Sequence, residues 1–371
     1  MALIVFFLVA LTILYFSHYL LYGSIVYFFQ VSGSRPRLFL AVILFLLPTS
    51  FIAVEVFGRH SANRLFGVLF FSATLWLGIG LTLMVFFALA WVAWGAVSLS
   101  ARQPDSVVFG AVAVVLACFY SAYGVWNAYH PRTVDVRVSI KNLPPAWQGK
   151  KIVQISDVHL GHILGADFLR GLVEQANAQN PDLVVITGDL FDGADGQLEE
   201  LVRPLDGLRA PLGIYFVTGN HETYLGVDRA YAALKTTPAR ILSDEMVVVN
   251  GLQIIGIAYP ERGFSRDLGE TLRKLVTFDR QAPSVLLYHN PTGIAQAKAA
   301  GVSLQLSGHT HKGQLFPIQF ISRLVYGKFY NGLHSESAFT IYTSSGAGTW
   351  GPTMRTGNHP EIAVIRLESP G

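Results

Sequence analysis

The stretch KIVQISDVHLG (residues 151–161) is an apolar run that leads directly into a polar turn with an aspartate and a histidine. Runs of this length, bounded by turn residues, are typical of strands buried on both faces. The pattern recurs along the chain as KIVQIS (151–156), DLVVIT (182–187), GIYFVT (213–218), LQIIGIA (252–258), SVLLYH (284–289), SLQLSG (303–308), FTIYTS (339–344) and EIAVIRL (361–367). Residues 151–371 therefore read as one strand-rich domain.

Helical patterns separate several of these runs, for example at 167–180 and 228–234. Strands that alternate with helices predict an α/β domain in which helices cover layered sheets. Residues 130–150 read as a linker to the preceding part of the chain. Within it, the alternating stretch 134–140 predicts an edge strand, which ends before Pro144 and Pro145.

The first 129 residues have a different character. The chain is 51% hydrophobic and only 14% charged, against about 25% charged residues in an ordinary soluble domain. A membrane span needs about 20 apolar residues, and we expect about four helices, at 2–29, 38–57, 65–98 and 107–126. The third run fits either one long helix or two short ones divided near GIG (78–80), and we favour the single helix.

The net charge and the cysteine content limit the kinds of binding site that the chain can contain. The formal net charge of +3 gives no support for binding to nucleic acid. The single cysteine, Cys118, excludes a disulfide within the chain and a thiolate metal site in the α/β domain. His18 and Glu55 are ionisable groups within the spans, and are either functional or, as we favour, a packed histidine and a glutamate at the interface.

The basic residues of the short loops bear on the orientation in the membrane, because cytoplasmic loops carry an excess of Lys and Arg. Arg59, Arg64, Arg132 and Arg137 lie on one side, and Arg35, Arg37 and Arg102 on the other. The small excess favours the cytoplasmic side for the α/β domain.

Polar residues of metal-ligand type follow five of the strands. They are Asp157 and His159, Asp189 and Asp192, Asn220 and His221, His289, and His309 and His311. In layered α/β folds, sites assemble at the carboxyl ends of strands. Each residue taken singly has a plain alternative as a loop residue, a helix cap or a turn residue. Five such strand ends in succession favour a common site.

These residue types fit a particular chemistry. Histidine nitrogen and carboxylate oxygen suit Mn, Fe and Zn. The set holds too many strong ligands for one ion, whereas two ions that share a carboxylate need about this number. Two ions roughly 3.5–4 Å apart form a clamp for in-line displacement at phosphorus. We therefore predict two divalent transition metal ions, with Mn favoured.

Taken in order, the blocks DVHLG, GDLFD, GNHE, YHNP and GHTH resemble the five signature blocks of the calcineurin-like metallophosphoesterases. The resemblance covers about residues 150–367 and implies a two-sheet sandwich flanked by helices. The later stretch SSGAGTWGPTMRTGNHPEI (344–362) resembles a membrane-anchored bacterial branch, that of the transmembrane proteins with a metallophosphoesterase domain. Some members of that branch act on lipid-linked substrates.

The resemblance also implies roles for the polar residues. Asp157, His159 and His311 would bind the first metal, Asn220, His289 and His309 the second, and Asp189 would bridge both. His221 would protonate the leaving oxygen. Asp192 would orient a ligand or His221, although a helix cap is an equal alternative. The two histidines of GHTH would thus bind different metals, which the loop and its glycines must arrange.

The function so implied is a membrane-bound phosphoesterase that hydrolyses phosphomonoester, phosphodiester or pyrophosphate bonds with a metal-activated hydroxide. Its substrate would be lipid-linked or nucleotide-linked, with Arg355 and His162 as candidate substrate-binding residues. The apolar stretch 315–330 either lies at the membrane interface, lines an acyl-chain pocket or belongs to the core. We expect a multi-pass protein of the bacterial inner membrane. The alternative is a catalytically silent scaffold or regulatory protein on the same fold.

Overall fold

The computed structural model describes residues 2–57, 64–100, 104–193, 197–261, 264 and 266–370. The chain divides into two compact units. One comprises Met1–Trp126 together with Gly351–Thr356, and the other comprises Asn127–Trp350 together with Gly357–Gly371. We describe each unit by itself.

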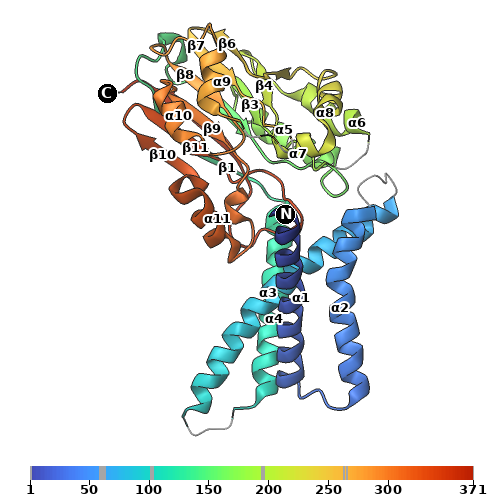
Figure 1. The fold of residues 1–371 in the computed structure, drawn as a ribbon. Coiled ribbons are helices and arrows are strands. Elements are labelled where there is room, and N and C mark those ends of the chain that lie inside the picture. Colours follow the sequence, from blue (N-terminus) through green and yellow to red (C-terminus); the bar gives the residue numbers. More distant parts are fainter. Residues whose placement is uncertain are drawn as a thin grey trace. The chain divides into compact units, whose positions relative to one another are not determined.

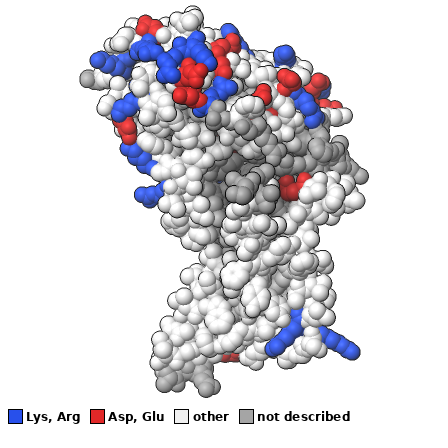
Figure 2. All heavy atoms as spheres, viewed as in Figure 1, with Lys and Arg blue, Asp and Glu red and all other residues white. Residues whose placement is uncertain are grey.

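Four apolar helices form most of the first unit, as the sequence predicted (Figure 1). They are α1 (Ala2–Phe28), α2 (Ser34–Phe57), α3 (Arg64–Ser98) and α4 (Ser106–Ala128). Each is long and apolar enough to cross a membrane. Figure 2 shows the visible face of this unit as white over most of its length, whereas charged residues gather on the other unit. Of the basic residues used to predict orientation, Arg59 and Arg102 lie outside the described residues.

Two details of these helices differ from, or extend, the sequence prediction. Helix α2 begins at Ser34 rather than Leu38, because Pro36 falls in the first turn, where a missing backbone N–H costs nothing. Helix α3 runs without a break through Gly78 and Gly80, so the single long helix is correct. His18 is packed against a neighbouring helix: its Nε2 atom accepts from Trp76 Nε1 at 3.0 Å.

A short segment of the distant C-terminal sequence belongs to this unit. Because Gly78 and Gly124 have no side chains, Met354 can pack directly against the backbone at both positions. The Tyr120 hydroxyl donates to the carbonyl of Thr356 at 2.6 Å, and the amide of Arg355 donates to the carbonyl of Gly124 at 2.8 Å. The segment Gly351–Thr356 is thus fixed to α3 and α4.

The second unit is a sandwich of two sheets, each of six strands within the described residues (Figure 1). The first sheet has the order β1 (Arg132–Ser139), β12 (Glu361–Glu368), β2 (Lys151–Ile155), β3 (Leu183–Thr187), β4 (Ile214–Val217) and β5 (Arg240–Ile241). β1 is the predicted edge strand and pairs in parallel with β12. β2, β3 and β4 pair in parallel, so their carboxyl ends lie at one edge.

The second sheet has the order β10 (Gly332–Glu336), β11 (Phe339–Thr343), β9 (Leu304–Ser307), β8 (Ser284–Leu287), β7 (Leu252–Gly256) and β6 (Glu245–Val249). Here β7, β8, β9 and β11 are parallel neighbours. The antiparallel β6 and β10 at the two edges were not predicted: β10 (GLHSE) is polar, whereas β6 (EMVVV) is apolar in four of its five residues. The fold class is otherwise the predicted one.

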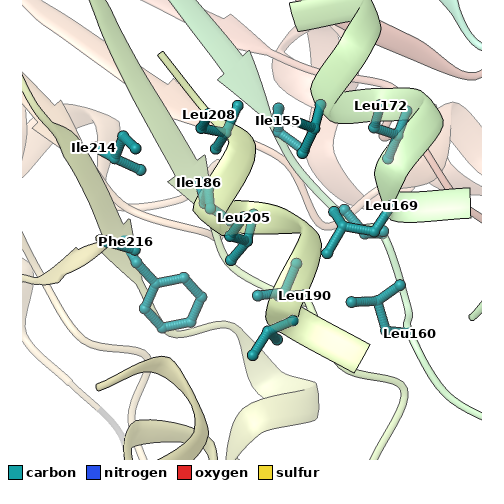
Figure 3. Close-up of a cluster of buried hydrophobic side chains, with 14 of the residues drawn as sticks. Ile155, Leu160, Leu169, Leu172, Ile186, Leu190, Leu205, Leu208, Ile214 and Phe216 are labelled. Carbon is teal, nitrogen blue, oxygen red and sulfur yellow. The ribbon is translucent and has the colours of Figure 1, made fainter. Parts of the chain in front are cut away.

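Helices cover the outer face of each sheet. These are α5 (Ala166–Asn177), α6 (Leu198–Val202), α7 (Asn220–Leu225) and α8 (Val227–Leu234), and later α9 (Leu268–Lys274) and α10 (Ile294–Ala299). A further helix, α11 (Ile318–Tyr326), has no buried residue. Figure 3 shows Leu169 and Leu172 of α5 packed against Ile155 and Ile186 of the first sheet.

Alternation along the strands explains why both faces are apolar. Ile152 and Leu183 point into the core between the sheets, whereas their neighbours Val153 and Val184 point to the helices. Gln154 breaks this apolar pattern. Its side-chain amide is fully buried and donates to Thr187 Oγ1 and to the carbonyl of Ser307, both at 2.9 Å. It therefore ties the ends of three strands, from both sheets, together.

Candidate metal centre

All the predicted metal ligands lie just beyond the carboxyl ends of strands from both sheets. Asp157 and His159 follow β2, Asp189 follows β3, and Asn220 opens α7 after β4. From the second sheet, His289 follows β8, and His309 and His311 follow β9. Because Gln154 and Ser307 join these strand ends, the two sets of loops meet.

Five of the seven predicted ligands have a positive φ angle: Asp157 at 53°, His159 at 56°, Asp189 at 51°, His309 at 73° and His311 at 47°. Such angles are uncommon outside glycine and carry a conformational cost, so they cluster where the surrounding structure enforces them. They also explain how side chains two residues apart escape the regular alternation of a strand. The glycines of the loop alone do not produce this arrangement, because His309 and His311 themselves leave the β conformation.

Glycines allow the backbone segments to approach each other. A Cβ atom on Gly308 would overlap Ser156 Oγ and Asp157 Oδ2. One on Gly219 would overlap Asp189 Oδ1. The absence of a side chain at Gly308 therefore lets the loop after β9 approach Asp157. In the same way, Gly219 lets the loop after β4 approach Asp189.

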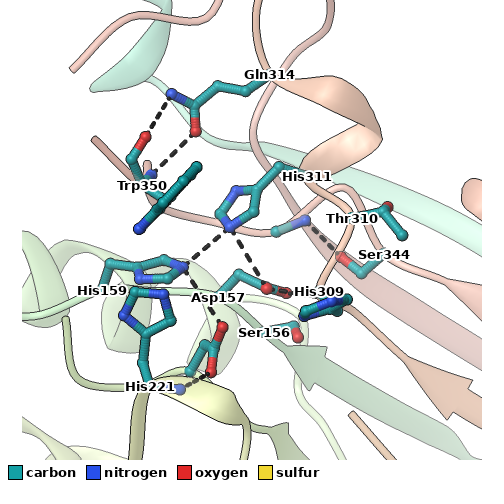
Figure 4. A network of polar contacts seen from close by, with 12 residues as sticks. Ser156, Asp157, His159, His221, His309, Thr310, His311, Gln314, Ser344 and Trp350 are labelled. Atoms are coloured by element: carbon teal, nitrogen blue, oxygen red, sulfur yellow. Dashed lines mark hydrogen bonds and ion pairs between the residues drawn. The ribbon is translucent and has the colours of Figure 1, made fainter. Parts of the chain in front are cut away.

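The first group of ligand atoms comprises Asp157, His159 and His311, whose candidate atoms all lie within 4.8 Å of one another (Figure 4). The Nε2 atoms of His159 and His311 are 2.9 Å apart. His311 Nε2 lies 3.5 Å from Asp157 Oδ1. The three side chains thus point their donor atoms at a common position.

The second group comprises Asp189, His289 and His309. Asn220 joins it, because its Oδ1 atom lies 2.8 Å from His309 Nδ1 and 3.1 Å from His289 Nε2. Asp189 Oδ2 is 3.1 Å from His289 Nε2 and 3.9 Å from His159 Nε2 of the first group. Asp189 is therefore placed between the two groups.

The hydrogen bond of His289 fixes which of its nitrogens faces the centre. Its Nδ1 atom lies 2.7 Å from the carbonyl of Thr187, which can only accept, so Nδ1 carries the proton and Nε2 points inward. An imidazole oriented in this way by a backbone carbonyl is the usual arrangement of a metal-binding histidine.

The electrostatics of the centre favour bound cations. Burial alone would raise the pKa of Asp189, but the positive charge of His289 holds it well below its usual range. Burial would lower the pKa of His289, but the charge of Asp189 raises it to about 9. Burial and the charge of His289 lower the pKa of His309 to about 3. The buried carboxylate thus attracts a positive charge, which a divalent ion can supply in place of the proton on His289. The donor set therefore fits two divalent ions.

His221 and Asp192 lie together beside the first group. His221 Nδ1 is 3.0 Å from the carbonyl of Asp192, and the ring packs edge-on against His159 at 4.5 Å. The Asp192 carboxylate lies 3.3 Å from His159 Nδ1 and 3.7 Å from His221 Nδ1. Burial lowers the pKa of His221, against the opposing charges of Asp189 and Asp192. Asp192 is therefore close enough to orient either the ligand His159 or His221, as the two forms of its predicted role require.

Glu222 is a residue of the site to which the sequence reasoning gave no role. Its carboxylate is fully buried and accepts from the amides of Gly219 at 2.6 Å, Asp189 at 2.9 Å and Phe191 at 3.1 Å. Burial and the charge of Asp189 raise the pKa of Glu222 to about 7. The signal was available, since an acidic residue three positions after Gly219 is part of the GNHE block.

Aromatic side chains surround the centre. Tyr224 and Trp350 pack against His221 at 5.2 and 6.3 Å, and Tyr326 and Tyr259 pack against His309 at 5.9 and 6.2 Å between ring centroids. Trp350 is 59% exposed. The side chain of Gln314 makes two hydrogen bonds to the backbone of Trp350. Its Nε2 atom donates to the Trp350 carbonyl and its Oε1 atom accepts from the Trp350 N–H, each at 3.0 Å (Figure 4).

Neither of the two predicted substrate-binding residues belongs to a ligand group. Arg355 is buried in the segment that packs with α3 and α4, so its role stays a prediction. His162 lies half-buried in the turn between Leu160 and Leu164, which pair with each other, and its role also stays a prediction.

Comparison with known proteins gives a consistent family. The model of the calcineurin-like phosphoesterases matches residues 150–313. An uncharacterized metallophosphoesterase of Campylobacter jejuni is 35% identical over 269 residues, covering 71% of this chain and 70% of that one. One of Helicobacter pylori is 36% identical over 223 residues, covering 58% and 59%. A transmembrane protein with metallophosphoesterase domain of Danio rerio is 33% identical over 281 residues, covering 69% and 62%. The chain thus spans about three fifths of the length of the latter two.

Proposed function

The chain belongs to the calcineurin-like phosphoesterases, and from that premise we propose that it is a membrane-bound enzyme that hydrolyses phosphate esters with two divalent metal ions. The bond cleaved is a phosphomonoester, phosphodiester or pyrophosphate bond. The observation that carries the proposal is the position of Asp189 between two groups of inward-pointing ligands.

The two groups define the two proposed metal positions. Asp157, His159 and His311 would hold one ion, Asn220, His289 and His309 would hold the other, and Asp189 would be shared. Of the ions that suit histidine and carboxylate ligands, we favour Mn over Fe and Zn. When bound, such ions lower the pKa of a water molecule and neutralise charge on phosphoryl oxygens.

His221 is the proposed general acid. Because Nδ1 donates to the carbonyl of Asp192, the ring is held with Nε2 available to give a proton to the leaving oxygen. Burial lowers the pKa of His221, and the carboxylates of Asp189 and Asp192 oppose that shift and so support the protonated form that the step requires. Asp192 would therefore position His221 through its carbonyl and His159 through its carboxylate.

The four apolar helices identify the chain as a membrane protein. A substrate at the membrane, such as a phosphate-bearing lipid or a lipid-linked nucleotide, is consistent with this attachment. We further propose that the protein lies in the bacterial inner membrane with its α/β unit in the cytoplasm. The basis is the excess of basic residues that includes Arg132 and Arg137, and a reporter fused to the C-terminus would test the orientation.

The proposal is tested by hydrolysis of an aryl phosphodiester and an aryl phosphomonoester by the purified full-length protein with Mn²⁺. Asp189→Asn should abolish turnover while the variant remains folded, because it weakens the ligand common to both ions. Asp206→Asn, which changes an exposed aspartate in the α/β unit, is the matched control and should keep full activity. An Asp189→Asn variant with normal turnover would refute the proposed mechanism.

A further inference from the structure

Helix α11 has no buried residue, although most of its side chains are apolar. The exposed side chains are Phe320 at 61%, Ile321 at 57%, Leu324 at 85% and Val325 at 66%. Their spacing of three and four residues puts them on one face of the helix. Contiguous apolar surface of this kind marks an interaction site on a soluble domain.

The charge around α11 indicates what that face contacts. The stretch 312–330 contains Lys312, Arg323 and Lys328 and no acidic residue. Arg323 is exposed and makes no ion pair within the described part of the chain, whereas Lys328 pairs with Glu336 at 2.6 Å. Exposed Leu and Phe side chains flanked by basic residues are typical of helices that lie in the membrane interface, where anionic head groups attract the cations.

Helix α11 is also connected to the metal centre. The ring of Tyr326, at its last turn and off the exposed face, lies 5.9 Å from the ring of His309. The Thr310 hydroxyl, between the two histidines of GHTH, donates to the carbonyl of Tyr330 at 2.6 Å. Helix α11, labelled in Figure 1, and the segment that follows it therefore contact the loop that carries His309 and His311.

A lipid bilayer is the apolar phase to which this unit is tethered, because the same chain carries four helices of membrane-spanning length. We propose that the exposed face of α11 lies in the interfacial layer of the bilayer and presents the metal centre to phosphate esters carried by membrane lipids. The second half of this statement rests on the proposed function, whereas the first half does not.

The position of the helix is tested with a fluorescent probe on the full-length protein in nanodiscs that contain anionic lipid. Cys118, the natural cysteine, is first replaced by Ala, and an environment-sensitive dye is attached to Leu324→Cys. Interfacial helices bury their apolar face about 5–10 Å into the head-group and acyl boundary. We therefore expect strong quenching by lipids labelled near the top of the acyl chain and weak quenching by aqueous iodide.

Val276→Cys is the matched control, since Val276 is an apolar residue of the same unit that is 94% exposed. Its dye should be quenched by iodide and not by labelled lipid. Iodide quenching at position 324 equal to that at 276 would overturn the proposal. Protection of position 324 from both quenchers would also overturn it, because protein would then cover the face.

The substrate half is tested with Leu324→Glu and Val276→Glu, assayed on a soluble aryl phosphate ester and on a phosphate ester carried in vesicles. Leu324→Glu should lose about tenfold in kcat/KM on the vesicle-borne ester, from the lost burial of one leucine, and keep its activity on the soluble ester. Val276→Glu should keep both. Unchanged vesicle activity in Leu324→Glu would overturn this half. If the proposed function itself is wrong, the unmodified protein will hydrolyse neither ester.

Discussion

The backbone amide of Asp189 donates a hydrogen bond to Glu222 Oε2 at 2.9 Å. A buried carboxylate therefore fixes the backbone of the aspartate that lies between the two ligand groups. We predict that Glu222→Gln weakens both folding and metal binding. A glutamine has only one acceptor oxygen, and its NH₂ group would face a backbone N–H. An unsatisfied buried donor costs about 1–3 kcal/mol. Urea denaturation and Mn²⁺ titration would measure the two effects. Glu174→Gln, on the exposed side of α5, should change neither.

Gly308→Ala should disturb the centre without removing a ligand. Its methyl group would overlap Ser156 and Asp157, and overpacking of this kind costs about 1–3 kcal/mol. We expect lower stability and weaker Mn²⁺ binding. Gly171→Ala is a matched control with the opposite sign: the site in α5 is open, and alanine stabilises an exposed helix interior by about 1 kcal/mol. Equal stability of the two variants would contradict the close approach of the loops.

Removal of divalent ions should lower the melting temperature. Ions bound only to the folded state at 100 times their Kd add about 2.7 kcal/mol, or about 5–10 °C for a domain of this size. A chelator titration followed by differential scanning fluorimetry would measure the shift. Asp189→Asn should show little dependence on Mn²⁺, whereas Asp206→Asn should behave as the unmodified protein does. A chelator without effect on either protein would argue against bound ions.

Asp192 and His221 should give different kinetic signatures. Asp192→Ala keeps the backbone carbonyl that binds His221 but loses the carboxylate beside His159. Loss of such an orienting partner lowers metal affinity by about 10–100-fold. His221→Gln should instead lower kcat by about 10²–10⁴-fold with metal affinity unchanged, as expected for loss of a general acid. Mn²⁺ dependence of turnover separates the two, and a common signature would refute the division of roles.

Much of this architecture could be predicted because it depends on local patterns. The eight apolar runs that predict strands in the α/β unit are all strands, whereas the apolar stretch 315–330 contains helix α11. The polar residues that follow these strands converge, since parallel neighbours end at one edge of a sheet. The edge strand β10 (GLHSE) was missed because its sequence lacks the apolar signature of a central strand. The edge strand β6 (EMVVV) was missed although four of its five residues are apolar.

What escaped the sequence depends on contacts between distant residues. The positive φ angles of His309 and His311 are imposed by the packing of the surrounding loops, and nothing local in GHTH requires them. Gln314 and Glu222 likewise make hydrogen bonds to residues that only the folded chain brings near them. The packing of the segment that contains Arg355 with the apolar helices is also a contact between distant parts of the sequence, and the substrate-binding role of Arg355 stays a prediction.

The return of the segment Gly351–Thr356 to the helical unit has a practical consequence. A fragment that starts at residue 127 would lack α3 and α4 but still contain Met354 and Arg355, both fully buried in the intact protein. Cleaving off the anchor would therefore remove the helices against which Met354 packs and leave an apolar patch exposed to solvent. Such a fragment should be prone to aggregation, and its inactivity would carry no information about whether the helices take part in turnover.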